Sequence, residues 1–278
     1  MPGIPIISLT TDFGLSDPFV GSMKGVVLSI NPRCQIVDLC HEVLPQNILH
    51  GAFLLSTSYS FLPKGSIHIG VVDPGVGTSR KAVLLVGDGH FFIAPDNGLL
   101  SLVLGKDQEA NSDLQHLVPY HRSIIPPWRA YDLTNSRYWL HPVSSTFHGR
   151  DIFAPVASHL SLGVDPEELG TPIGELQCFY IPRPSWRDGL LKGHVLHVDR
   201  FGNLITDLGE NEFAESSREV IIEVGGQRID GLSPFYDLTK KLIALIGSHN
   251  YLEISVPRGS ASHVLNVSIG DTVVVQLM

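Results

Sequence analysis

The chain has 278 residues, of which 43% are hydrophobic and 17% are charged, and its formal net charge is −9. This apolar content is sufficient for one large domain or two smaller ones, and it argues against long disordered segments. A net negative surface repels phosphates, so neither nucleic acid nor an anionic membrane is expected as a partner.

The three cysteines, Cys34, Cys40 and Cys178, include no C-x-x-C pair. An odd cysteine count in a chain of this length indicates a reduced, cytoplasmic protein. The first residues, MPGIPIISL, have no basic region before their apolar run, so they predict a first strand and not a signal peptide. No apolar run reaches the roughly 20 residues that a membrane helix needs.

Strand and helix patterns alternate through the first half of the chain. Helices are expected at 19–30, with Ser16 or Asp17 as the cap and Pro18 in the first position, and at 47–62, 97–105 and 149–163. Strands are expected at 4–9, 35–39, 66–72, 81–87 and 90–94. The alternation predicts an α/β domain over residues 1–180 with a mostly parallel central sheet. Residues 106–146 are expected to form an irregular excursion.

The composition and the secondary-structure pattern of the sequence change after residue 180. Residues 181–188 are rich in proline and polar side chains and are interpreted as a linker. Short strand patterns follow at 190–199, 203–208, 219–229, 241–247, 251–257 and 272–277. Gly225-Gly226 indicates a hairpin turn. Residues 189–278 are therefore expected to form a smaller all-β domain, a barrel or a sandwich.

The stretch VDPGVGTSR, residues 72–80, follows a predicted strand but matches no phosphate-binding motif. It lacks the third glycine of a dinucleotide fingerprint and the lysine of a P-loop. His194, His197 and Asp199 could suggest a metal site, but on a strand the two histidines point to opposite faces. No metal is predicted.

Three polar features remain as candidates for chemistry. Asp12 and Asp73 each follow a predicted strand, at the edge where open α/β sheets gather ligands. Asp12 could accept both hydroxyls of a ribose, or it could cap a turn. Asp73 and Arg80 could polarise a bound anion or water, or they could form a structural pair.

The third feature is His148, in STFHGRDIFAP, between Phe147 and Gly149. A lone histidine is more often structural than catalytic. If Asp73, Arg80 and His148 met, His148 could take a proton, Asp73 could orient it or a water, and Arg80 could lower the pKa of that water. Spacing along the chain does not show that they meet.

Six segments in a fixed order give the chain a family resemblance: TTDFG with FVGSMKG, VDPGVGTSR, APDNGLLS, TFHGRDIFAP, DRFGNLITD and GSHNYLEISVPRGSA. They resemble those of the S-adenosyl-L-methionine hydroxide adenosyltransferases, the adenosine-forming S-adenosylmethionine hydrolases, which are relatives of the fluorinase and chlorinase. The resemblance implies an N-terminal α/β domain, a C-terminal β-barrel and a homotrimer. It also implies sites between the N-domain of one subunit and the C-domain of its neighbour.

The resemblance assigns roles to particular residues. It implies a water-activating set of Asp73, Arg80 and His148, with Asp12 on the ribose. Phe147 and Gly149 join the substrate-binding set, and Gly149 stands where the fluorinase-type relatives carry a halide-binding serine. It further implies that four residues hold the adenine ring: Asn203, Ser248, Glu253 and Val256. Asp199 and Phe201 match positions near the methionine portion and the base. The span from Asn97 to Phe147 is longer than the family pattern.

The implied reaction is attack of activated water on C5′ of S-adenosylmethionine, with methionine as the leaving group and no cofactor. Halide as the nucleophile is one alternative, although Arg80 and His148 argue against it. A non-catalytic adenosine or S-adenosylmethionine binding protein is the other.

Overall fold

The computed structural model describes residues 3–105, 119–180, 183–213 and 220–277. These residues divide into two compact units, with the boundary between Phe179 and Tyr180. Part of the predicted linker, residues 181 and 182, lies outside the described residues, and Ser185–Arg187 form a short strand. The α/β class of the first unit and the all-β class of the second are confirmed.

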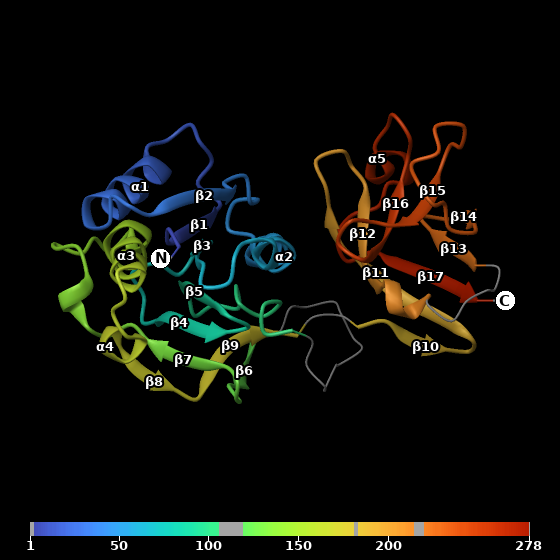
Figure 1. The fold of residues 1–278 in the computed structure, drawn as a ribbon. Coiled ribbons are helices and arrows are strands. Elements are labelled where there is room, and N and C mark those ends of the chain that lie inside the picture. The colour runs from blue at the N-terminus through green and yellow to red at the C-terminus, as the bar shows by residue number, and fades with distance from the viewer. Residues whose placement is uncertain (1–2, 106–118, 181–182, 214–219, 278) are drawn as a thin grey trace. The chain divides into compact units, whose positions relative to one another are not determined.

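The first unit is built on a seven-stranded sheet with the order β2-β1-β3-β5-β4-β7-β8 (Figure 1). The pairs β1–β2, β1–β3 and β3–β5 are parallel, and β4–β5, β4–β7 and β7–β8 are antiparallel. The sheet is therefore mixed, and only its β2-β1-β3-β5 part has the expected parallel character. The strands are β1 (Ile6–Thr11), β2 (Gln35–Cys40), β3 (Ile67–Val71), β4 (Ala82–Gly87), β5 (His90–Pro95), β7 (Arg129–Asp132) and β8 (Thr171–Ile173).

Helices pack on both faces of this sheet because its strands carry apolar side chains in both directions. Leu84 and Ile93 belong to the core that contains residues of α1 and α3, whereas Val83 and Phe92 belong to the core that contains residues of α2. This period-two division is what a sheet buried on both faces requires. The helices are α1 (Phe19–Ile30), α2 (Ile48–Ser58), α3 (Ala154–Ser161) and α4 (Pro166–Leu169), with short helical turns at Tyr59–Phe61 and Ser136–Tyr138 and a π-helix at Gly149–Phe153.

Three expectations for this unit are wrong. Helix α1 has Pro18 at its N-cap with no side-chain cap, so neither Ser16 nor Asp17 caps it. The helix expected at 97–105 is a run of turns. Gly98 and Gly105 both have positive φ angles, of 98° and 79°, which a continuing right-handed helix does not allow.

The third error concerns the excursion at 106–146. Its residues 106–118 lie outside the described part, but the rest contains ordered strands. Strand β6 (Pro119–Ser123) pairs with β9 (Glu175–Phe179), and β7 joins the central sheet next to β4. Exposed and half-buried residues alternate along β6, but the segment is too polar for its pattern to be recognised as a strand.

The second unit is an antiparallel, nearly closed, barrel-like sheet (Figure 1). The Gly225-Gly226 turn connects β13 and β14, and its φ angles of 55° and 70° suit the tight hairpin that the sequence predicts. The elements are β10 (Ser185–Arg187), β11 (Leu190–Val198), β12 (Leu204–Gly209), a helical turn at Glu210–Glu212, β13 (Val220–Val224), β14 (Gln227–Asp230), β15 (Ile243–Ile246), β16 (Tyr251–Ser255), α5 (Ala261–Leu265) and β17 (Thr272–Leu277).

Across the described ranges, no helix is both long and apolar enough to span a bilayer.

Candidate functional site

Two of the predicted polar residues lie at the carboxyl ends of neighbouring parallel strands. Asp12 directly follows β1 and Asp73 follows β3, and these strands pair in register from Ile7–Ile67 to Thr11–Val71. The backbone N–H of Asp12 lies 3.4 Å from the carbonyl of Val71. Asn97, just after β5, donates from Nδ2 to the carbonyl of Val72 at 2.8 Å. Hydrogen bonds therefore connect the ends of β1, β3 and β5 next to the loop that carries Asp73.

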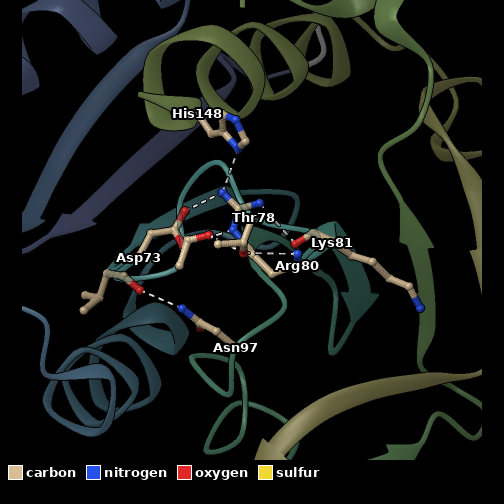
Figure 2. Close-up of polar contacts among 8 residues, drawn as sticks. Asp73, Thr78, Arg80, Lys81, Asn97 and His148 are labelled. Carbon is tan, nitrogen blue, oxygen red and sulfur yellow. Dashed lines mark hydrogen bonds and ion pairs between the residues drawn. The ribbon is translucent and has the colours of Figure 1, made fainter. Parts of the chain in front are cut away.

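The glycine-rich loop returns Arg80 to Asp73. Two turns close the loop: the Val76 N–H donates to the backbone carbonyl of Asp73, and the Thr78 N–H donates to that of Gly75. Arg80 Nε donates to Asp73 Oδ1 at 3.0 Å, and Nη2 pairs with Oδ2 of the same carboxylate (Figure 2). The side chains are only 9% and 5% exposed. This two-bond geometry matches a guanidinium to a carboxylate and fixes both groups.

His148, 68 residues further along the chain, contacts the same guanidinium. Its Nδ1 lies 2.8 Å from Arg80 Nη2 (Figure 2). Because arginine can only donate, Nδ1 is the acceptor, and the proton of the neutral imidazole lies on Nε2. Burial lowers the pKa of His148, and so does the Arg80 charge, while Asp73 and Asp151 oppose the shift. The imidazole is therefore neutral at neutral pH.

One close approach joins the Arg80 loop to the His148 loop, and one hydrogen bond closes the His148 loop on itself. Gly77 has a φ of 79°, and a Cβ at this position would lie 2.2 Å from the carbonyl oxygen of Ser145. Only glycine allows this approach. Asp151 is fully buried in the π-helix after His148, and its Oδ2 accepts the backbone N–H of Ser144 at 2.8 Å. Sequence reasoning missed both contacts, which depend on tertiary approach.

A pocket of about 420 Å³ lies beside this cluster in the first unit. Five predicted residues line it: Asp12, Asp73, Phe147, His148 and Gly149. Arg80 is not among the lining residues, but it contacts two of them, Asp73 and His148. The Asp12 carboxylate accepts the backbone N–H of Gln46 at 2.8 Å, which leaves further acceptor capacity for a ligand. Sequence analysis missed Phe13, Phe19, Pro45, Gln46, Val71, Pro74, Val76 and Thr146 in this lining.

The second unit has its own pocket, of about 740 Å³. All six predicted residues of this half line it: Asp199, Phe201, Asn203, Ser248, Glu253 and Val256. Sequence analysis missed the other lining residues: Tyr236 and Leu238 belong to no motif that it quoted, and the rest lie within quoted motifs but were not singled out. They are Ile205, Tyr236, Leu238, His249, Ser255, Pro257, Arg258 and Gly259.

A hydrogen-bond chain fixes the polar wall of this second pocket. Asp199 Oδ1 accepts the backbone N–H groups of Phe201 and Asn203, each at 2.8 Å. Asn203 donates from Nδ2 to Asp199 at 2.9 Å and accepts from the Ser255 hydroxyl at 2.6 Å. The orientation of the Asn203 amide is thereby defined, with one N–H and one lone pair left for a ligand.

The histidines of β11 form no metal cluster in the described part of the chain. No group of three or more His, Cys, Asp or Glu side chains there is placed to hold a metal ion. His194 instead lies beside a buried carboxylate, with Nδ1 3.5 Å from Asp207 Oδ2.

The α/β unit with a polar cluster at its strand ends, and the barrel-like unit with a second polar pocket, define a two-domain protein built to bind a small molecule. The chain belongs to the SAM hydroxide adenosyltransferase family. The N-terminal domain of that family matches residues 7–170, and its C-terminal domain matches residues 193–274. The resemblance inferred from the sequence is confirmed.

Individual relatives match over nearly the whole chain. An (R)-S-adenosyl-L-methionine hydrolase of Thermus thermophilus is 36% identical over 262 residues, which cover 94% of this chain and 95% of the relative. A Methanocaldococcus jannaschii protein of the same name is 32% identical, with coverage of 97% and 95%. A fluorinase of Nocardia brasiliensis is 24% identical, with coverage of 98% and 97%. The crystal structure of an uncharacterized conserved protein from Thermotoga maritima matches with a TM-score of 0.84 at 31% identity, covering 98% of this chain and 99% of that one.

Proposed function

We propose that this protein hydrolyses S-adenosyl-L-methionine to adenosine and L-methionine. The observation that carries the proposal is the contact of Asp73, Arg80 and His148 at a pocket of nucleoside-binding size. Relatives named as S-adenosyl-L-methionine hydrolases, similar over nearly the full chain, support it.

The reaction is a substitution at C5′. A water oxygen forms the new bond to C5′ as the bond from C5′ to the sulfonium sulfur breaks. The electron pair of that bond remains on sulfur, so methionine leaves as a neutral thioether and needs no general acid. One proton of the water must be removed, and it becomes strongly acidic only as the oxygen bonds to carbon. The site therefore has to hold the water in line and accept one proton.

We propose a role for His148 other than that of proton acceptor. Its Nδ1 already accepts from Arg80, and Nε2 carries the proton, so the ring faces a water as a donor. We assign the proton acceptor to Asp73, which lines the pocket and has free lone pairs besides those used by Arg80. Arg80 fixes both neighbours and supplies a positive charge behind them.

The remaining assignments follow the family resemblance and are part of the same proposal. Asp12 holds the ribose hydroxyls, and Phe147 and Gly149 line the sugar region. The six lining residues of the second pocket hold the adenine ring and the methionine portion: Asp199, Phe201, Asn203, Ser248, Glu253 and Val256. No cofactor is required, because a neutral group leaves from a cation. We also propose a cytoplasmic location and domain limits at 1–180 and 189–278, joined by 181–188.

We further propose a homotrimer in which each site joins the first unit of one subunit to the second unit of its neighbour. Large apolar side chains exposed around the second pocket support this assembly. Phe201, Phe235 and Leu238 are 75%, 63% and 61% exposed. Clusters of this kind on a folded protein indicate an interaction surface.

Product analysis in labelled water tests the proposed reaction. The protein is incubated with S-adenosylmethionine in water enriched in a heavy oxygen isotope, and the products are separated by chromatography. Adenosine with the label in its 5′-hydroxyl and unlabelled methionine are expected. A halogenated nucleoside formed in chloride buffer, or no turnover, would contradict hydrolysis.

A further inference from the structure

The second pocket contains a carboxylate that the water-activating cluster does not use. Glu253, on β16, lines the pocket and is 5% exposed. Burial raises the pKa of Glu253, and the hydrogen bond from Tyr236 opposes the increase. A buried carboxylate requires hydrogen-bond partners, and in a ligand pocket the ligand can provide one of them.

One oxygen of this carboxylate is held by Tyr236. The Tyr236 hydroxyl donates to Glu253 Oε1 at 2.7 Å. Tyr236 lines the same pocket and is 49% exposed, so its ring forms part of the wall and its hydroxyl points inward to Glu253. Burial and the adjacent carboxylate raise the pKa of Tyr236 to about 12, so the hydroxyl remains a donor throughout the physiological pH range.

The other oxygen of Glu253 lies against Gly247. A Cβ at residue 247 would come within 2.5 Å of Glu253 Oε2, so this carboxylate position depends on glycine there. Gly247 directly precedes Ser248, which lines the pocket. The Tyr236 hydroxyl occupies Oε1, and Oε2 is the oxygen on the Gly247 side.

We propose that Tyr236 is a positioning residue that fixes Glu253 so that the pocket selects a 6-amino purine against a 6-oxo purine. The inference rests on the proposed function, which places the base of the substrate in this pocket. An ionised carboxylate only accepts hydrogen bonds, so it pairs with an exocyclic amine. A 6-oxo group at the same place would put its oxygen, an acceptor, against Oε2, which is also an acceptor, so no hydrogen bond would form. Sites that leave a buried polar group unpaired reject the wrong ligand strongly.

Tyr236 also prevents the carboxylate from adapting. With Oε1 occupied by a donor, the group cannot turn away from an unsuitable base without losing the Tyr236 bond. Selectivity therefore comes from the pair, and a structural Tyr–Glu contact without this role would affect all ligands equally. The difference between these two cases is measurable with adenosine and inosine, which differ in the 6-amino and 6-oxo groups.

The experiment measures the dissociation constants of adenosine and inosine by calorimetry on the full chain. Wild-type protein should prefer adenosine by about 100-fold or more. Tyr236→Phe keeps the ring, and it should lower that preference by about tenfold, the loss expected for one hydrogen bond to a charged group. Tyr138→Phe is the matched control, because it removes a hydroxyl that donates to Glu168 at 3.2 Å outside both pockets. It should leave the preference unchanged.

Glu253→Gln gives the sharper test. Tyr236 still donates to the amide oxygen of the glutamine, so the amide N–H groups face the base, and the preference should move towards inosine. In the double variant with Tyr236→Phe the amide can turn, and the preference for either nucleoside should largely disappear.

Three results would overturn the proposal. They are equal weakening of both nucleosides in Tyr236→Phe, an unchanged preference in Glu253→Gln, and wild-type protein that binds neither nucleoside. The test distinguishes failure of this proposal from failure of the proposed hydrolysis. If the protein prefers adenosine but forms no adenosine from S-adenosylmethionine, the hydrolysis is wrong and the base selection stands. If it forms adenosine but does not distinguish the two nucleosides, the base selection is wrong and the hydrolysis stands.

Discussion

At the residue scale, Arg80 joins the members of the proposed catalytic cluster. It donates to both oxygens of Asp73, to Nδ1 of His148 and, at 3.3 Å, to the carbonyl of Lys81. Its guanidinium carbon lies 5.5 Å from the ring centre of Phe153. A lysine ammonium is a single point of charge on a flexible stem and cannot make these contacts together.

We therefore expect Arg80→Lys to lower kcat by about 100-fold or more, the range of a lost acid–base contribution. The adenosine dissociation constant should stay within about twofold, because Arg80 lies outside the pocket lining. Stopped assays of adenosine formation and calorimetry with adenosine provide the two measurements. Arg129→Lys, an exposed residue of β7, is the matched control. A large loss of adenosine binding in a folded Arg80→Lys protein would show that Arg80 holds the nucleoside instead.

Sequence reasoning reached part of this cluster. Asp73 and Arg80 are seven residues apart in a glycine-rich loop, so their pairing is a local possibility. His148 is 68 residues from Arg80, and no spacing rule connects them, so only the family resemblance suggested that they meet. Tyr236 belongs to no motif, and its contact with Glu253 depends on the packing of the loop before β15.

At the element scale, β3 and β5 bring two histidines together inside the sheet. His68 is fully buried, and its Nε2 lies 3.1 Å from Nδ1 of His90. Its own Nδ1 lies 2.7 Å from the hydroxyl of Ser8 on β1, and its ring stacks on Phe92. Burial lowers the pKa of His68 to about 3, with a further contribution from His90, whose own pKa is also lowered.

Stability should consequently fall in mild acid. The pKa of His68 in the folded state is below its unfolded value of about 6.5, so the unfolded chain binds the proton first as the pH drops. The resulting loss in the free energy of unfolding is small above pH 6.5 and grows below it, reaching about 2 kcal/mol at pH 5.

Urea unfolding at pH 7 and pH 5 measures this difference. His68→Gln should reduce the difference whatever its own effect on stability, whereas exposed His263→Gln should leave it unchanged. An unaltered difference in His68→Gln would show that other groups cause the acid sensitivity.

Elements with strong periodicity were predictable from the sequence, and those set by glycine geometry or tertiary pairing were not. The apolar run at residues 67–71 became β3 as expected, whereas 97–105 has helical spacing but has glycines with positive φ near its start, at Gly98, and at its end, at Gly105. Strand β6 is too polar to be recognised alone, and its register is set by pairing with β9.

At the scale of the whole molecule, the candidate substrate-binding residues are divided between the two units. Asp12, Asp73 and His148 line a pocket in the first, whereas Asn203 and Glu253 line a pocket in the second. Each pocket lacks the residues of the other. The proposed trimer brings the two kinds of pocket into one site by pairing units from neighbouring subunits.

Mixed assemblies test this pairing. His148→Ala and Asn203→Ala should each be nearly inactive alone, and their coexpression should restore activity, with about a quarter of the sites intact under random mixing. Adenosine formation by the purified mixture provides the measurement. Coexpression of Arg80→Ala with His148→Ala is the control, because both changes affect the same unit and no intact site can form. Activity that merely averages the two parents in the first mixture would place each site within one chain.

The close approach of Gly77 to the Ser145 carbonyl has a consequence for how this protein tolerates change. Position 77 contributes only space, yet any larger residue there would push the loop carrying Arg80 away from the loop carrying His148. A variant screen scored by turnover alone would therefore rank this glycine with the proposed catalytic residues, although it has no side chain that could take part in the reaction.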